Sequence, residues 1–374
     1  MNTTRKTWLL LSLSALMTAN LYAQRTPYLK DAFKGKFSIG AAISAKQVVS
    51  KDKKLQNIVK KEFDCLVAEN CMKGEVVSPA EGKWDFTDAD RFVDYCEKNR
   101  KDCYGHCLVW HSQAPLWTFK GPDGQTVTRD LLLKRMTDHI RKVVTRYKGR
   151  VKAWDVVNEA IESDGSFRKS YYYNIIGEEF FEIAFKTAHE CDPDAMLFYN
   201  DYNVEIPAKR EATIALVKKL RAKGCRVDGV GIQSHVSLDM PLDEYERTIQ
   251  ALDDAGCKVM ITELDLSVLP WPGGNNGAAV ETNFAYTDAL DPYKNGLPKE
   301  KADEFNRFYE ALFAIYLRHA DAITRVNFWG IGDADSWRNG WPVAGRTDYP
   351  LPFDRQLNPK GFVPVIAKMA VQQK

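Results

Sequence analysis

An excess of charge of either sign is missing from this sequence. Its 374 residues contain 52 Lys and Arg against 50 Asp and Glu, a net charge of +2. This balance gives no reason to expect nucleic acid or an anionic membrane surface as a partner, and it is compatible with a neutral substrate. Histidine is also scarce: the six residues form no HxH or HExxH spacing. We therefore expect no metal and no cofactor.

A hydrophobic run long enough to cross a membrane is missing as well. The apolar stretch Trp8–Met17 follows Arg5 and Lys6 and is too short for a stable span. Basic residues, a short apolar segment and a small residue before a cleavage site are typical of a secretory signal peptide. No cysteine follows to carry a lipid anchor. We predict a signal peptide over residues 1–23, a mature chain from Gln24, and export to the periplasm or the extracellular space.

The redox motif CxxC is absent, although the chain has eight cysteines. An exported protein could oxidise them, but a chain of this size does not depend on disulfides for stability. Several of them lie in predicted strands or helices, where Cys packs as a small apolar residue. We expect mostly free, buried thiols with one or two bridges among Cys65, Cys71, Cys96, Cys103, Cys107, Cys191, Cys225 and Cys257.

Strand-like and helix-like segments alternate through the rest of the chain. Amphipathic stretches such as 129–147, 171–190 and 208–223 predict helices, and Gly224 suits a helix C-cap. Between them, apolar β-branched runs predict strands at 37–44, 65–70, 103–110, 151–159, 196–203, 229–236, 258–266 and 323–331. This order predicts the α/β class and a single (β/α)8 TIM barrel over residues 24–374. A doubly wound open sheet is the alternative, which the lack of a glycine-rich nucleotide fingerprint disfavours.

Two glutamates stand at the tips of buried strands. Glu159 ends the run that starts at residue 151, and Glu263 lies inside the run 258–266. A helix cap or a structural ion pair would explain one such carboxylate. Two of them, each among polar and aromatic residues, favour a pair of carboxylates that face one substrate, as glycoside hydrolysis requires.

Other polar side chains gather at the same ends of the predicted strands. Purely structural residues would be scattered over both ends of a barrel, whereas active sites lie at the carboxyl ends of its strands. The residues that gather there are Glu69, Asn70, His106, Trp110, His111, Asn158, Glu159, residues 200–203, Gln233, His235, Glu263, Asp265 and Trp329. The sequence therefore predicts one site at the carboxyl face.

The motifs around these residues resemble those of family 10 glycoside hydrolases, which are endo-1,4-β-xylanases on a (β/α)8 barrel. The resemblance covers nearly the whole mature chain, and the motifs follow the family's order. They are ENCMK at 69–73, GHCLVWHSQ at 105–113, WDVVNEA at 154–160, YNDYN at 199–203, GIQSHV at 231–236, ITELD at 261–265 and FWGIGDADSW at 328–337.

The resemblance implies a secreted endo-1,4-β-xylanase that hydrolyses internal β-1,4-xylosidic bonds of xylan with retention. Glu159 would be the acid/base and Glu263 the nucleophile, so their environments should push their pKa values apart. Retention requires carboxyl groups about 5–5.5 Å apart. Residues two apart on a strand share a face, so Glu263 and Asp265 can both reach His235. Such an Asp–His–Glu chain would help to hold Glu263 ionised, and losing His235 should then reduce turnover far more than stability.

The resemblance also implies a set of sugar-binding residues. Lys73, His106 and Asn158 would surround the sugar beside the scissile bond with Gln233 nearby, and Glu69 and Asn70 would contact the next sugar on the glycone side. Trp329 and Trp337 would form apolar walls that leave little room for the hydroxymethyl group of glucose. Trp110 could serve barrel packing, sugar binding, or both.

The sequence departs from the family pattern in three places. Gly74 stands where an aromatic residue is common, and the stretch 338–354 is particular to this chain. The connection Pro270–Lys299 is long and rich in Gly, Asn, Pro and aromatics. Loops of this length are often functional. We hypothesise that it borders the aglycone subsites or the rim of the cleft, with a decoration that does not touch substrate as the alternative.

Three other functions remain open at this point. A metal-dependent hydrolase could use His106, His111, His235 and Asp265. A barrel relative could bind sugar without catalysis, although both glutamates argue against this. A retaining hydrolase of the same barrel type could act on cellulose or β-mannan, but the contexts of Lys73, His106 and Trp337 favour xylan. We expect xylan and xylo-oligosaccharides as the only partners, and a monomer.

Overall fold

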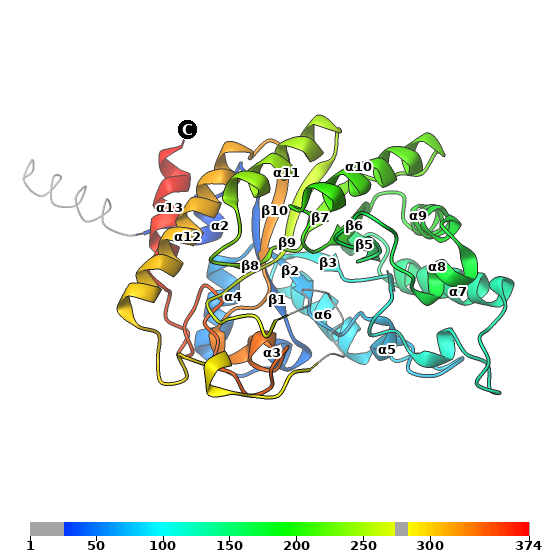
Figure 1. The fold of residues 1–374 in the computed structure, drawn as a ribbon, viewed down its shortest axis with the longest axis horizontal. Coiled ribbons are helices and arrows are strands. Elements are labelled where there is room, and N and C mark those ends of the chain that lie inside the picture. Colours follow the sequence, from blue (N-terminus) through cyan, green and yellow to red (C-terminus); the bar gives the residue numbers. More distant parts are fainter. Residues whose placement is uncertain (1–25, 274–282, 374) are drawn as a thin grey trace, which may run out of the picture.

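Short, buried strands form a closed parallel barrel at the centre of the molecule (Figure 1). The computed structural model describes residues 26–273 and 283–373, so the predicted signal peptide lies outside the described residues. The barrel strands are β1 (Ser38–Ile43), β2 (Cys65–Ala68), β3 (Asp102–Gly105), β5 (Val151–Asn158), β6 (Met196–Asp201), β7 (Gly229–Ile232), β9 (Lys258–Ser267) and β10 (Ile323–Phe328).

The ladder closes because β10 pairs in parallel with β9 on one side and with β1 on the other. Two short strands, β4 (Val109–Trp110) and β8 (His235–Ser237), extend the ladder beside β5 and β9. The predicted (β/α)8 barrel is therefore confirmed, and the open-sheet alternative is wrong.

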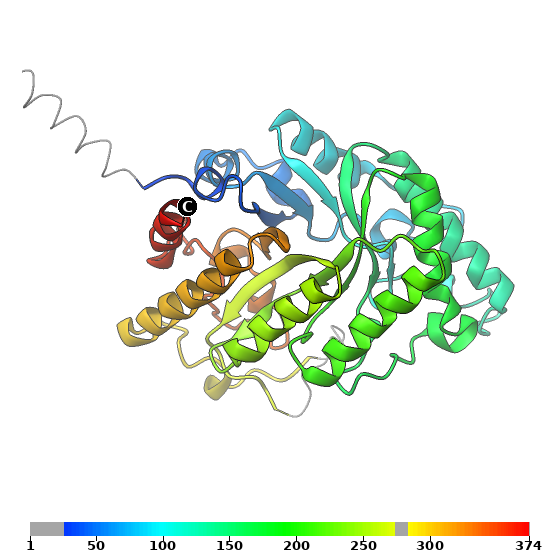
Figure 2. The ribbon, with the colours of Figure 1, turned by 90° about the horizontal axis from the view of Figure 1, so that it is seen from above.

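Helices cover the outside of the barrel, as Figure 2 shows from a second direction. Their amphipathic faces bury apolar residues against the strands, for example Leu132, Met136 and Ile140 of α7. The helices are α2 (Leu29–Ala32), α3 (Ala45–Val48), α4 (Lys53–Glu62), α5 (Gly74–Val77), α6 (Thr87–Lys98), α7 (Arg129–Arg146), α8 (Tyr171–Ile176), α9 (Glu179–Cys191), α10 (Pro207–Ala222), α11 (Leu242–Asp254), α12 (Lys299–Arg318) and α13 (Phe362–Gln372).

Three predicted elements are split in the structure. The run 103–110 breaks into β3 and β4, and the run 229–236 breaks into β7 and β8, where Ser234 adopts a φ of 64°. The predicted helix 171–190 is divided at Gly177, which has a φ of 85° and ends α8. Gly224, at a φ of 78° after α10, has the left-handed conformation expected of a C-cap glycine.

All eight cysteines are free thiols, and seven of them are buried. The expectation of mostly buried thiols is confirmed, whereas the one or two expected bridges are wrong. Burial explains the difference: Cys65, Cys96 and Cys103 are at most 1% exposed and fill the barrel and its inner helix faces as apolar groups.

No helix in the described part of the chain is both long and apolar enough to cross a bilayer.

Candidate active site

A cleft of about 890 Å³ opens at the carboxyl ends of the barrel strands. Most side chains predicted for the site line it: Glu69, Asn70, Lys73, His106, Trp110, Glu159, Gln233, His235, Glu263, Trp329 and Trp337. Asn158 and Asp265 are buried and hydrogen-bonded to residues that line the cleft. The structure thus brings the predicted residues to one place, and His111 is not among the lining residues.

Glu159 follows the last residue of β5 and adopts a left-handed backbone conformation, with φ at 55°. This conformation is uncommon for a residue other than glycine and costs free energy unless neighbours hold it. The N–H of Glu159 donates to the carbonyl of Asn200 at 2.9 Å, and its own carbonyl accepts from Arg168 Nε at 2.8 Å. The backbone is therefore fixed on both sides of the turn that presents the carboxyl group.

The carboxyl group of Glu159 is 4% exposed and accepts three hydrogen bonds. Gln233 Nε2 and Asn158 Nδ2 donate to Oε1 at 2.8 and 3.2 Å, and Trp110 Nε1 donates to Oε2 at 2.8 Å. Burial raises the pKa of Glu159 to about 7, the negative charge of Asp201 adds to this, and the bonds from Gln233 and Trp110 oppose it. The carboxyl group of Glu159 can therefore hold a proton up to neutral pH. Trp110 is buried and donates a hydrogen bond to this carboxyl group.

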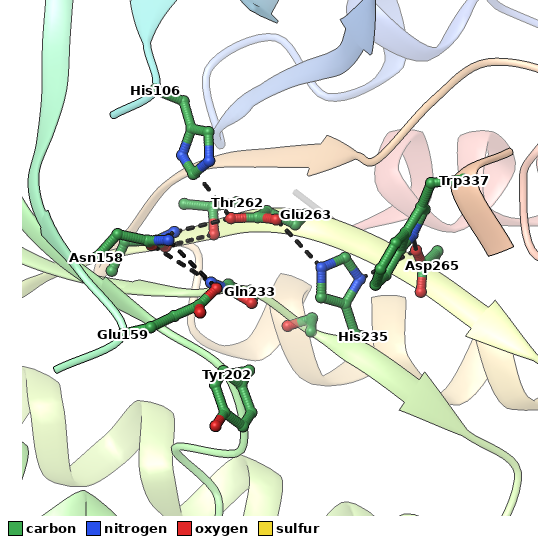
Figure 3. A network of polar contacts seen from close by, with 12 residues as sticks. His106, Asn158, Glu159, Tyr202, Gln233, His235, Thr262, Glu263, Asp265 and Trp337 are labelled. Atoms are coloured by element: carbon green, nitrogen blue, oxygen red, sulfur yellow. Dashed lines mark hydrogen bonds and ion pairs between the residues drawn. The ribbon is translucent and has the colours of Figure 1, made fainter. Parts of the chain in front are cut away.

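Glu263 lies on β9 and has the opposite electrostatic environment (Figure 3). Asn200 Nδ2 donates to its Oε1 at 2.8 Å, His235 Nε2 is 3.1 Å from its Oε2, and His106 Nδ1 is 4.0 Å from Oε1. Burial alone would raise the pKa of Glu263, but the interactions with His106, His235 and Asn200 outweigh it and hold this pKa below its ordinary value. The two carboxyl groups of one cleft thus differ in pKa in the predicted direction.

His235 bridges Glu263 and Asp265, and Figure 3 shows the chain of contacts. Its Nδ1 is 3.0 Å from Asp265 Oδ2. Burial alone would lower the pKa of His235, but the two carboxylates raise it to about 9, so both ring nitrogens donate at neutral pH. Asp265 also accepts from Trp337 Nε1 and from Arg338 Nε, both at 2.7 Å. The expected Asp–His–Glu contact geometry is present, with Arg338 as a partner that sequence reasoning missed.

Asn200 on β6 bonds to several residues of this network, although its position at a strand end predicts no particular role. Its side-chain Nδ2 donates to Glu263 Oε1 and to Asn158 Oδ1, at 2.8 and 2.9 Å. Its side-chain Oδ1 accepts from Thr262 Oγ1 at 2.7 Å. Gly231 makes room for it, because a Cβ there would lie 2.3 Å from Asn200 Oδ1. That glycine, inside the GIQSHV motif, is the sequence signal that could have indicated a close approach.

Lys73 contacts two polar side chains that line the cleft. Its Nζ donates to Asn70 Oδ1 at 2.8 Å and to Gln113 Oε1 at 2.7 Å, and lies 4.9 Å from the centre of the Trp110 ring. Burial lowers the pKa of Lys73. Gln113 was quoted in a motif but not predicted as a site residue, and its contact with Lys73 explains its presence there.

Aromatic rings form one wall of the cleft. Trp329 packs against His106 and His235, with ring centres 5.3 and 6.3 Å apart. Trp337 stacks on Trp341, with ring centres 4.9 Å apart and an angle of 11° between the ring planes. Trp341 therefore adds an aromatic ring to the predicted tryptophans, although it was not predicted as a site residue. Such flat apolar faces suit the C–H faces of sugars.

The long connection after β9 reaches the cleft through its first residues. Pro270 and Trp271 line the cleft, and Trp271 packs against Trp341 with ring centres 5.4 Å apart. Residues 274–282 of this connection lie outside the described residues. Its contact with substrate therefore stays a prediction.

The histidines of the metal-hydrolase alternative are not arranged around one point. His106 Nδ1 contacts Asp155 at 2.9 Å, and both nitrogens of His235 face carboxylates. Burial lowers the pKa of His111 to about 3, with Arg168 and Lys209 adding to the effect. Over residues 26–273 and 283–373, no group of three His, Cys, Asp or Glu side chains is placed to hold a metal ion.

Comparison with known proteins gives a consistent result. The model of glycosyl hydrolase family 10 matches residues 28–369. The endo-1,4-beta-xylanase A of Xylanibacter ruminicola is 47% identical over 348 residues, which cover 93% of this chain and 94% of that protein. A beta-1,4-xylanase of Dictyoglomus thermophilum is 41% identical over 89% of this chain and 88% of its own.

Solved structures agree with the sequence relatives. A GH10 endoxylanase from a sugarcane soil metagenome superimposes with a TM-score of 0.88 at 45% identity, covering 91% of this chain and 99% of that one. A Paenibacillus barcinonensis xylanase, solved with a conduramine derivative, gives a TM-score of 0.82 at 35% identity, covering 93% and 98%. The barrel, the motifs and these matches show that the chain is a glycoside hydrolase and belongs to glycosyl hydrolase family 10.

Proposed function

We propose that this protein is a retaining endo-1,4-β-xylanase in which Glu159 is the acid/base and Glu263 the nucleophile. The observation that carries the proposal is the pair of buried carboxyl groups in one cleft whose pKa values are moved in opposite directions, to about 7 for Glu159 and below the ordinary value for Glu263. A retaining glycosidase needs one carboxyl group that is protonated and one that is ionised at the same pH. The names of the relatives support xylan as the substrate.

The reaction follows from these protonation states. Glu263 attacks the anomeric carbon while Glu159 gives its proton to the leaving oxygen, so the glycosidic C–O bond breaks as the glycosyl–enzyme ester forms. Glu159, now ionised, takes a proton from water, whose oxygen attacks the same carbon and releases Glu263. Two displacements restore the β configuration. A carboxyl separation of about 5–5.5 Å belongs to this proposal.

Substrate selection would come from the residues around the carboxyl pair. Lys73, Asn70 and Glu69 lie at one end of the cleft, where their polar groups can bind sugar hydroxyls. Trp329 and Trp337 stand beside His235, so a hydroxymethyl group on the adjacent sugar would meet an indole face. This favours xylose over glucose and therefore xylan over cellulose or β-mannan.

The substrate test is product analysis after incubation with xylan, cellulose and β-mannan side by side, with Glu263→Ala as the inactive control. We expect short xylo-oligosaccharides from xylan alone. Release of cello- or manno-oligosaccharides instead would keep the carboxyl pair and overturn the xylan assignment. A protein that binds xylan yet releases nothing would be a sugar-binding relative.

The two roles are separable with azide and an aryl xylobioside whose leaving group needs no acid. Without the Glu263 carboxylate, azide occupies the nucleophile's side and should give the inverted α-glycosyl azide. With Glu159→Ala, the ester on Glu263 still forms, and azide should replace water to give the β-glycosyl azide. Products of the opposite configuration would reverse the assignment. Direct observation of the first-formed anomer by NMR checks retention in the unaltered enzyme.

We also propose export through residues 1–23 and a monomeric state. N-terminal sequencing of protein from producing cells should give a chain that begins near Gln24, and an intact Met1 would contradict this. Light scattering should give the mass of one chain.

A further inference from the structure

An arginine at the side of the cleft has hydrogen-bonding capacity that the fold does not use. Arg346 lines the cleft and is 3% exposed. Within the described residues its one hydrogen bond runs from Nη1 to the carbonyl of Pro270 at 3.2 Å, and its buried Nε has no partner. A buried donor without a partner costs free energy, so such groups call for an explanation.

The acidic residues near Arg346 are engaged elsewhere. Asp348 accepts from Ser267 Oγ at 2.6 Å and from the N–H of Tyr349 at 2.7 Å, and Asp291 accepts from the N–H of Thr347 at 3.1 Å. Among the described residues, no carboxylate forms an ion pair with Arg346. Burial lowers the pKa of Arg346, and the charges of Asp348 and Asp291 oppose this shift. Its Nε therefore has no acceptor among the described residues, although Arg346 lines the cleft.

The neighbouring arginine shows the contrast. Arg338 also lines the cleft, but its Nε donates to the buried Asp265 at 2.7 Å, and this contact serves the chain that runs to His235. Arg338 therefore belongs to the machinery already described, whereas Arg346 serves no contact of that machinery.

The place of Arg346 in the barrel separates it from the line of the substrate backbone. At the two ends of the cleft, the lining residues Asn70 and Lys73 follow β2, and Tyr202 and Glu205 follow β6. Arg346 follows β10, which lies between β9 and β1 in the ladder. It thus flanks the line between the two ends, where a substituent on a backbone sugar would project.

The surroundings of Arg346 suit a sugar ring that carries a negative charge. Trp271 and Trp341 line the same part of the cleft and pack on each other, which offers an apolar face next to the guanidinium. A planar guanidinium with free donors matches the two oxygens of a carboxylate. Side groups of xylan that carry a carboxylate are uronic acids.

We propose that Arg346 binds the carboxylate of a uronic acid side group on the xylan backbone, in a lateral branch of the cleft walled by Trp271 and Trp341. The assignment rests on the proposed xylanase function and adds to it a preference for acidic branches over neutral ones.

The test compares two ligands that differ only in charge. One is a xylo-oligosaccharide with a single uronic acid side group, and the other is the same compound with its carboxyl group reduced to the alcohol. We expect kcat/KM to be about tenfold higher for the acidic compound, as one charge-assisted hydrogen bond implies, and this preference to shrink at high salt. Arg346→Met should abolish the preference. Arg318→Met is the matched control, because Arg318 pairs with Glu246 on the outer helices, and it should retain the preference.

Each outcome decides the assignment. Equal rates of the unaltered enzyme on the two compounds would overturn it without any variant, and so would a preference that survives in Arg346→Met. An equal effect of Arg346→Met on an arabinose-branched compound would assign the branch to neutral sugars and overturn the carboxylate. If the unaltered enzyme failed on unbranched xylo-oligosaccharides as well, the xylanase function itself would fall, which distinguishes the two failures.

Discussion

Removing the imidazole of His235 tests how the fold keeps the proposed nucleophile ionised. In His235→Asn the shorter amide can occupy the position of Nδ1 and still donate to Asp265, but nothing replaces the Nε2 donor or the positive charge beside Glu263. In His235→Gln the amide can reach the position of Nε2, which restores a neutral donor to Glu263. The two variants therefore separate the contact from the charge.

The size of the effect follows from the contacts that remain. Glu263 keeps the bond from Asn200 at 2.8 Å and the neighbouring His106, and loses one charge-assisted hydrogen bond. Such a bond contributes about 1.5–3 kcal/mol. We expect His235→Asn to lower kcat about 10- to 100-fold and to move the acid limb of the kcat/KM profile toward neutral pH by about 1–2 pH units. His235→Gln should fall between this variant and the unaltered enzyme.

The variant should stay folded, because Asp265 keeps Arg338 and Trp337. We expect the free energy of unfolding to fall by about 1.5–3 kcal/mol in His235→Asn, which is the contribution of the lost charge-assisted bond. The pKa of His235 is about 9 in the fold against an ordinary 6.5, so its stabilising contribution is complete below pH 6.5 and is lost as the pH rises through about 9. The stability difference between the two proteins should therefore fade above pH 9.

The assay is steady-state kinetics on an aryl xylobioside across pH, with urea unfolding at three pH values. His319→Asn is the matched control, since His319 contacts Glu246 at 3.1 Å on the outer helices, and its kinetic profile should not move. The reasoning is refuted if the acid limb of His235→Asn stays in place, or if its activity falls only in proportion to the fraction of unfolded protein.

Further predictions concern Glu159 and the thiols. With Glu159 as the acid, kcat/KM should decline above about pH 7. Trp110→Phe removes a bond that lowers the pKa of Glu159 and should shift this basic limb to higher pH. Asp201→Asn removes a charge that raises the pKa of Glu159 and should shift the limb to lower pH. Shifts of the two variants in the same direction would contradict the assignment. Arg168→Met removes the hydrogen bond to the carbonyl of Glu159 and should lower kcat about tenfold while KM stays nearly unchanged. The measurement is a pH-rate profile, with Arg129→Met as the control variant. Because all eight cysteines are free, a reducing agent should leave the thermal midpoint unchanged in calorimetry, and a lower midpoint would indicate a disulfide.

The sequence predicted the barrel because its signals are local and repeated. Most strands contain apolar β-branched residues, and most predicted boundaries differ from the observed ones by no more than a few residues. The splits occur where the chain turns within an apolar run: Ser234 has a positive φ without being glycine, so composition gives no warning of it. Gly177, which divides α8 from α9, was visible in the sequence but a single glycine does not always end a helix.

The proposed site residues could be named in advance because they lie at strand ends inside recognisable motifs, whereas their partners could not. Asn200 and Arg338 act through contacts between segments far apart in the chain, for example the 2.8 Å bond between Asn200 and Glu263. Such pairs depend on strand register, and a shift of one residue would turn every side chain of a strand to the other face. The expectation of one or two disulfide bridges failed for a related reason, since pairing depends on distances that no sequence spacing supplies.

The conformation of Glu159 links these points to function. A buried strand normally alternates its side chains between the barrel interior and the helices, so Asn158 and Glu159 on a regular strand would face opposite ways. The left-handed turn at Glu159 removes this alternation, and both side chains reach the same cluster, where Asn158 Nδ2 lies 3.2 Å from Glu159 Oε1. The turn costs free energy, and Arg168 and Asn200 offset it by bonding the carbonyl and the N–H of Glu159. The fold thus uses a strained residue to point one carboxyl group at a cleft whose second carboxyl group lies within β9. We infer that replacing Arg168 weakens catalysis through this turn, without touching substrate.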